Sequence, residues 1–239
     1  MATGFIYVVK SVNRDYMQRA SCNVPTEFGD RLYFGPCKKQ MRPRMKTRDF
    51  IFGVSPACTS PRRIIFVAEI EDPMTFAEAY LRFPGLQGPE GPIHVRPIPG
   101  IGAFPQSSYE HIPGSMHEDD WVDDLATPDL DRFFVCRQRD GFEGRWLGSS
   151  GPEIDDEILA FLNTCSVYGR AGYLGQNTGT LRNPIAYGGM YTGLHLETPS
   201  PEVLTAICRN RISGEDEPES GPAPPRSPGP CAIKNRRTC

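Results

Sequence analysis

A chain of 239 residues can bury a sizeable core, as one domain with appended pieces or as two domains, and its 24 Gly and 24 Pro predict extensive loops. No apolar run approaches the roughly 18 residues of a membrane span, and residues 1–12 lack the pattern of a secretory signal, so we expect a cytoplasmic protein without membrane contact. The eight cysteines are irregularly spaced without a CxxC pair, which argues against a disulfide framework and a paired-cysteine zinc site.

The first predicted element is a strand near the amino terminus. Residues 5–9 read FIYVV, a compact apolar run typical of a buried central strand. Residues 11–35 mix polar and apolar types and contain turn signals at Pro25 and Gly29. We therefore expect an irregular excursion between the first strand and residue 36.

The next segment is the most basic part of the chain. Residues 36–48 contain no acid and six cations, namely Lys38, Lys39, Arg42, Arg44, Lys46 and Arg48. Such a cluster in a chain with a formal net charge of −3 predicts an anion-binding rim for phosphate groups. The alternative is a solvated loop whose charges only keep the protein soluble.

Two core strands and a helix are predicted after the basic segment. Residues 50–52 read FIF and residues 64–68 read IIFVA, so we expect them to pair as a hairpin. In residues 74–83, Thr75 and Glu78 have capping-box spacing, and one face is formed by Phe76, Tyr80 and Phe83. This pattern predicts a short amphipathic helix.

Residues 84–118 form a long stretch rich in Pro and Gly that holds three of the four histidines, which is typical of a functional loop. Beyond it we expect a strand at 132–136, a helix at about 152–168 and a strand at 194–197. A closing helix is predicted after Ser200, with Val203, Leu204 and Ile207 facing inward. Residues 1–210 would form a single domain, and residues 211–239 a disordered Pro-, Ser- and Gly-rich tail.

Two groups of polar residues are candidate catalytic residues. If residues 94–96 are extended, His94 and Arg96 point to the same side, where they would combine proton transfer with anion binding. The second group is His111, His117, Asp119 and Asp120. These residues suggest a divalent metal, but their spacing matches no established ligand pattern, and loop fixation and helix capping near Asp119 is the favoured interpretation.

A third candidate is the Gly-rich stretch of residues 172–193. Its glycines would let backbone amides approach a phosphate or a base, and tyrosines such as Tyr191 would stack on a flat ring. A long β-hairpin with tight turns explains the pattern equally well. The sequence contains no Walker A motif, no dinucleotide fingerprint and no GxSxG, and it assigns no cofactor.

The order of these pieces resembles the second of the nucleotide modification associated domain families. The resemblance extends to about residue 210 and is carried by LYFGPCKKQMRPRMKTRDFIFGVSP, RRIIFVAEIEDPMTFAEAYLRFP, GPIHVRP, YEHIPGSMHEDDW, RWLGSSGPEID and NPIAYGGMYTGLHLE. It implies a role in making or recognising modified bases in bacterial and phage DNA, alongside other DNA-modification proteins. It supplies a context but no reaction.

A second similarity bears on the fold. RDFIFGVS followed by RRIIFVAEI, within residues 46–72, is similar to the strand pair that opens the small barrel of PUA-like domains, including the EVE and ASCH groups. We therefore expect an α+β fold with a mixed, barrel-like sheet, two or three covering helices and long loops.

These observations lead to three functional hypotheses. In the favoured one, the protein binds a DNA base or nucleotide: the basic segment holds phosphates, His94 and Arg96 line the pocket, and the base stacks on Tyr109, His111, Trp121 or Tyr191. In the second, a histidine acts as general acid or base, oriented by Asp119 or Asp120, in transfer or hydrolysis on a nucleotide. The third is a protein-interaction scaffold.

Overall fold

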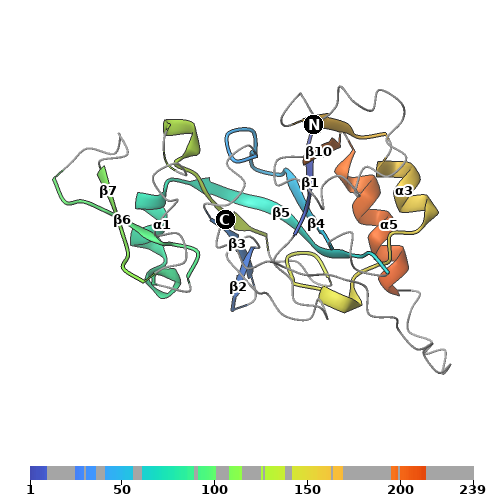
Figure 1. Cartoon of the computed structure of the whole chain (residues 1–239), viewed down its shortest axis with the longest axis horizontal. Coiled ribbons are helices and arrows are strands. Elements are labelled where there is room, and N and C mark those ends of the chain that lie inside the picture. Colours follow the sequence, from blue (N-terminus) through green and yellow to red (C-terminus); the bar gives the residue numbers. More distant parts are fainter. Residues whose placement is uncertain are drawn as a thin grey trace, which may run out of the picture.

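The computed structural model describes residues 1–9, 25–29, 31–35, 41–55, 61–88, 91–100, 108–114, 125, 127–137, 142–162, 164–168, 195–198 and 200–213. In this part of the chain a large mixed sheet, a two-stranded sheet and three α-helices form an α+β fold, as predicted (Figure 1). None of the described helices has the length and apolar content that crossing a bilayer requires.

The large sheet has the strand order β2-β3-β8-β5-β4-β1-β10-β9. Its strands are β1 (Gly4–Val8), β2 (Thr26–Phe28), β3 (Arg31–Phe34), β4 (Phe50–Val54), β5 (Ile64–Met74), β8 (Phe133–Cys136), β9 (Ser166–Tyr168) and β10 (His195–Thr198). β1 and β4 are parallel, and the other neighbours are antiparallel. Among the described strands, β2 and β9 form the two edges of the sheet.

The long strand β5 joins the two halves of this sheet. Its first half pairs with β4, which confirms the predicted hairpin, and its second half pairs with β8. Along the first half, Gly144 and Leu147 donate backbone hydrogen bonds to Val67 and Ile65, at 2.8 Å each. The central strand is therefore paired on both edges, which fits its nearly continuous apolar sequence.

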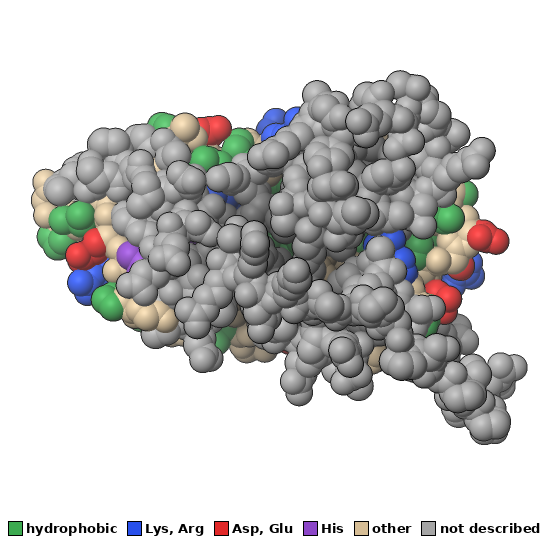
Figure 2. Space-filling model, in the orientation of Figure 1, with side chains coloured by type: hydrophobic (Ala, Val, Ile, Leu, Met, Phe, Trp, Pro, Cys, Tyr) green, Lys and Arg blue, Asp and Glu red, His purple; other side chains and the backbone are tan. Residues whose placement is uncertain are grey.

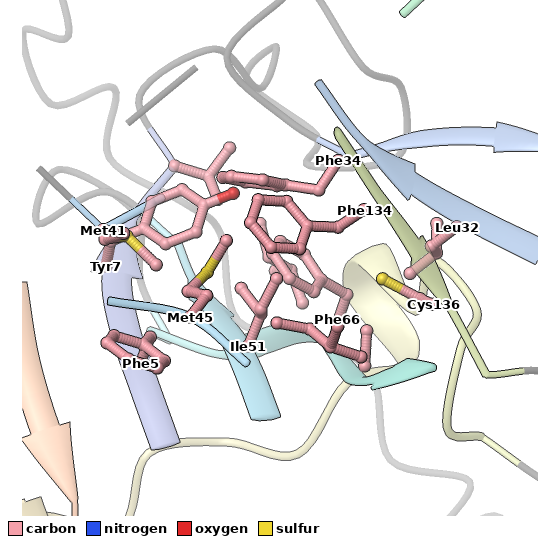
Figure 3. Close-up of a cluster of buried hydrophobic side chains, with 14 residues drawn as sticks. Phe5, Tyr7, Leu32, Phe34, Met41, Met45, Ile51, Phe66, Phe134 and Cys136 are labelled. Carbon is pink, nitrogen blue, oxygen red and sulfur yellow. The ribbon is translucent and has the colours of Figure 1, made fainter. Parts of the chain in front are cut away.

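Both faces of the central strands are buried. In β1, Phe5 and Tyr7 lie on one face and Ile6 on the other, as strand periodicity requires. The first face packs against Met41 and Met45, and Figure 3 shows these side chains gathered with aromatic residues of β1, β3, β5 and β8. The second face is covered by α3 (Asp156–Leu162) and α5 (Pro201–Ser213) (Figure 1).

A smaller unit packs beside β8. It contains α1 (Phe76–Arg82), the 3₁₀ helix η1 (Pro84–Leu86) and the antiparallel strands β6 (Val95–Pro97) and β7 (Tyr109–His111). The predicted capping box of α1 is confirmed, because Thr75 accepts a hydrogen bond from the Glu78 backbone and Glu78 accepts one from the Thr75 backbone. The stretch predicted as one long loop, residues 84–118, thus contains regular structure.

Three further predictions need correction. Residues 26–34 contain the β2–β3 hairpin rather than an irregular excursion. The helix predicted at 152–168 is shorter and comprises only α3. Asp155 precedes its first residue and accepts a hydrogen bond from the Ile158 backbone amide at 2.9 Å. Residues 166–168 form a strand that pairs with β10. In α5, Val203 is exposed, whereas Leu204 and Ile207 pack against the core as predicted. The other buried side chains of this helix are Pro201, Thr205 and Cys208.

The strand predicted at 194–197 and the helix predicted after Ser200 are confirmed as β10 and α5. Helix α5 continues to Ser213, into the first residues of the predicted tail. The rest of that tail, residues 214–239, lies outside the described residues.

Candidate anion-binding turn

Residues 41–49, which comprise residues 41–48 of the basic segment and the following Asp49, form a turn that we call the basic turn. Met41 and Met45 are fully buried and fix it to the sheet. The Asp49 carboxylate accepts hydrogen bonds from the backbone amides of Lys46 and Thr3, at 2.8 Å each. The Arg48 amide donates to the Ile70 carbonyl at 2.8 Å, which joins the end of the turn to β5. The turn is therefore held at both ends by buried contacts.

Arg42 differs from the other cations of the turn. Its side chain is fully buried, and its guanidinium donates a hydrogen bond to the Leu130 carbonyl in η3 (Pro128–Leu130). The prediction that Arg42 holds a phosphate at the surface is therefore wrong. A buried guanidinium that bonds to another segment has a structural role.

Arg44, Lys46 and Arg48 are exposed. Arg48 has a φ of 73°, and it is the one non-glycine residue with positive φ in the described part of the chain. A side chain in this region costs on the order of 1 kcal/mol, and such strain is concentrated at functional sites. The turn therefore places an arginine where the backbone alone would favour glycine.

Most exposed arginines elsewhere in the described structure are paired with acids. Such ion pairs are formed by Arg31 with Glu71, Arg82 with Asp72, Arg96 with Glu110, Arg137 with Glu69, Arg209 with Glu143, and Arg211 with Asp155 and Glu157. Figure 2 shows the mixture of basic and acidic side chains at both ends of the molecule. Lys46 and Arg48 have no ion-pair partner within the described residues. These two cations therefore differ from the paired arginines in the described part of the chain.

Arg132 lies against the basic turn, although the sequence indicated only that it begins a strand. Its Nη1 donates hydrogen bonds of 3.2 Å to the carbonyls of Arg42 and Pro43. The guanidinium carbon lies 5.3 Å from the centre of the Phe134 ring, within cation–π range. Arg42 and Arg132 thus bind each other's segments and clamp the turn to residues 130–132.

Asp131 connects this clamp to the smaller unit. Its carboxylate accepts hydrogen bonds from the Phe76 amide at 2.8 Å and from the Tyr109 hydroxyl at 2.6 Å. Burial raises the pKa of Asp131, and the bonds from Tyr109 and Phe76 and the charge of Arg42 oppose that rise. Burial and the bond to Asp131 raise the pKa of Tyr109.

These contacts decide the position of Tyr109. Its side chain is only 3% exposed, and its hydroxyl accepts a hydrogen bond from the Ala77 amide at 3.2 Å. The prediction that Tyr109 stacks on a base is therefore wrong, because both the ring and the hydroxyl are used inside the fold.

His94 and Arg96 do not share a pocket. His94 precedes β6 and is buried against Phe76, at a ring-centre distance of 5.5 Å, whereas Arg96 is exposed and pairs with Glu110 across the small sheet at 2.6 Å. His94 instead lies edge-on to the half-buried His111, with ring centres 6.0 Å apart. No group of three or more potential metal ligands is present among the described residues.

Several predicted site residues lie outside the described residues. They are Lys38, Lys39, His117, Asp119, Asp120, Trp121 and Tyr191. The structure therefore brings together Arg44, Lys46 and Arg48 on one turn and adds Arg132 beside it. It buries the Arg42 side chain of the same turn inside the fold and places Tyr109 and the His94–His111 pair in the smaller unit.

In comparisons with known proteins, no family model, no curated protein and no solved structure matches the chain.

Proposed function

We propose that the protein binds a base or nucleotide of nucleic acid, with its phosphates held by the basic turn. The observation that carries the proposal is the exposed pair Lys46 and Arg48, which have no ion-pair partner within the described structure and stand on an anchored turn. Phosphate contacts supply most of the sequence-independent affinity for nucleic acids. Basic residues on a fixed turn lose little conformational freedom on binding, which favours affinity.

The setting of this proposal is DNA modification in the cytoplasm of a bacterium or of a phage-infected cell. Its support is the resemblance to the second nucleotide modification associated domain family, and other DNA-modification proteins would be partners. A barrel-like, PUA-like sheet also belongs to the proposal, supported by the shared central strand β5 and the irregular register between Ile70 and Asp72. Trp121 and Tyr191 remain the proposed stacking residues.

The proposal predicts a salt-dependent affinity for DNA that requires the basic turn. In the variant Arg44→Ala/Lys46→Ala/Arg48→Ala, the negative slope of log affinity against log salt should become shallower by about 2.7 for duplex DNA. Each lost phosphate contact removes about 0.9 from the magnitude of the slope. Fluorescence anisotropy with short single-stranded and duplex DNA, plain and base-modified, measures this slope.

The control removes the same charge elsewhere. Arg82→Ala/Arg96→Ala/Arg211→Ala deletes three exposed arginines that are already paired with acids. This control should retain the wild-type slope. An equal decrease in both variants would show that net charge matters and the turn does not, and would contradict the proposal. Arg42 is excluded from both variants because its removal would disturb the fold.

Arg48→Gly separates backbone strain from binding. Glycine accepts a φ of 73° without steric cost, so the free energy of unfolding of the variant should rise by roughly 0.5–1 kcal/mol. The loss of one phosphate contact should at the same time reduce the magnitude of the salt slope by about 0.9. Thermal unfolding and DNA titration of the same preparation measure the two effects. Increased stability with unchanged DNA affinity would exclude Arg48 from the phosphate contacts.

The contact between His94 and His111 favours a second candidate function, transfer or hydrolysis on a nucleotide with a histidine as general acid or base. His111→Gln should then abolish conversion of a bound nucleotide without weakening its binding. In a protein that only binds, no conversion would be found with the wild-type chain.

A further inference from the structure

Arg132 is held more firmly than an ordinary surface arginine. Its Nη1 bonds to two backbone carbonyls of the basic turn, and its guanidinium packs on the Phe134 ring. The carbonyls belong to Arg42 and Pro43, which immediately precede Arg44. Arg132 is therefore oriented before any ligand arrives and lies beside the proposed phosphate-binding residues.

The charge of Arg132 lacks a carboxylate partner within the described structure. Burial lowers its pKa, and the more distant charges of Asp129 and Asp49 only partly oppose this effect. Neither acid forms an ion pair with Arg132. Arg137, one residue beyond β8, differs because it pairs with Glu69 at 3.6 Å. A bound anion would offset the desolvation of Arg132.

The hydrogen bonds leave one edge of the guanidinium for a ligand. A guanidinium carries five N–H donors, and within the described residues only Nη1 is engaged. The remaining Nε–Nη2 edge has the planar, two-pronged geometry that matches two oxygens of a phosphate. Lysine, with a single ammonium group, does not reproduce that geometry.

We propose that the Nε–Nη2 edge of Arg132 binds a phosphate group at the site formed by Arg44, Lys46 and Arg48. This inference rests on the proposed function and adds the residue that orients the phosphate. The three exposed cations of the turn supply attraction, while the immobilised guanidinium of Arg132 fixes the position of two phosphate oxygens. The phosphate belongs either to a DNA chain or to a mononucleotide.

The first test compares two lysine substitutions. Arg132→Lys keeps the positive charge and loses the two-pronged contact, so the affinity for a short DNA should fall about tenfold with little change in salt slope. Arg137→Lys, the matched control, should bind as the wild type does. Equal affinity of Arg132→Lys and wild type, with both proteins folded by circular dichroism, would overturn the inference.

The second test distinguishes direct contact from support of the turn. The ¹H–¹⁵Nε signal of Arg132, assigned by its loss in Arg132→Lys, is followed during titration with a short DNA, a deoxynucleoside monophosphate or inorganic phosphate. It should shift in proportion to the bound fraction. A shift with DNA alone assigns the site to phosphodiesters, and a shift with all three ligands assigns it to phosphate groups in general.

The outcomes separate the two proposals. If DNA binds with the predicted dependence on Arg44, Lys46 and Arg48 but the Arg132 signal does not move at saturation, the inference about Arg132 fails and the proposed function stands. If the wild-type chain binds none of the ligands, both are overturned.

Discussion

Replacing Asp131 by alanine is expected to lower the free energy of unfolding by about 3–5 kcal/mol, the range observed when one partner of a buried charged network is removed. The substitution would remove the carboxylate that accepts hydrogen bonds from the Phe76 amide and the Tyr109 hydroxyl. It would also remove the negative charge near the buried Arg42. Urea unfolding measures the loss. Asp129→Ala is the control, because Asp129 lies two residues earlier and is exposed.

The pH dependence of the same site has a defined sign. Burial raises the pKa of Asp131 in the folded state, so the folded chain holds this proton more strongly than the unfolded chain does. The resulting stabilisation is complete below the ordinary aspartate pKa and is lost as pH rises through the raised value. Asp131→Asn does not titrate, so its stability relative to wild type should improve as pH increases through this interval. A constant difference would contradict the assignment.

Gly53→Ala is expected to cost about 2–3 kcal/mol, in the upper part of the range for overpacking a core. Gly53 lies directly opposite Phe66, and a Cβ at this position would be 1.9 Å from Cε1 of the Phe66 ring. The ring cannot easily move, because it packs between Tyr7 and Trp146 at ring-centre distances of 6.0 Å each. Thermal or urea unfolding would measure the effect.

A double substitution tests the cause of this loss. In Gly53→Ala/Phe66→Leu the smaller side chain removes the clash, so the double variant should lose less stability than the sum of the single variants. Gly85→Ala is the control, since a Cβ at this position would lie nearest to the half-exposed Phe28 ring, at 3.2 Å. Strict additivity would show that Phe66 does not determine the cost at Gly53.

The central strands could be predicted because their local pattern and final environment agree. β1, β4, the first half of β5 and β8 are short apolar runs, and each is buried on both faces. The capping box of α1 is equally local, since Thr75 and Glu78 bond to each other's backbones. In these elements the residues that form the local sequence pattern are also the residues whose packing and hydrogen bonds stabilise the element.

Other elements depend on contacts distant in sequence. The strand of residues 166–168 follows a helical pattern, and its pairing with β10 decides its conformation. The hairpin β2–β3 is stabilised by pairing of β3 with β8, about 100 residues later in the chain. Neither partner is visible in a window of neighbouring residues, so both segments were assigned incorrectly.

The candidate site shows the same limit. Arg42 and Arg48 belong to one basic run, yet the first is buried against η3 and the second is exposed with positive φ. Composition predicted the cluster but not which cations face outward. The sequence placed Arg132 at the start of a strand and gave no indication of its contact with the basic turn, because that contact is made with two carbonyls about 90 residues earlier.

The most direct test of the account is titration of the wild-type chain with a short duplex DNA at 50 and 200 mM salt. If Arg44, Lys46 and Arg48 each contact a phosphate, the affinity should fall roughly 40-fold between these concentrations, from a slope of about −2.7. An affinity that does not change with salt, or no binding at the lower concentration, would contradict a phosphate-binding function for the basic turn.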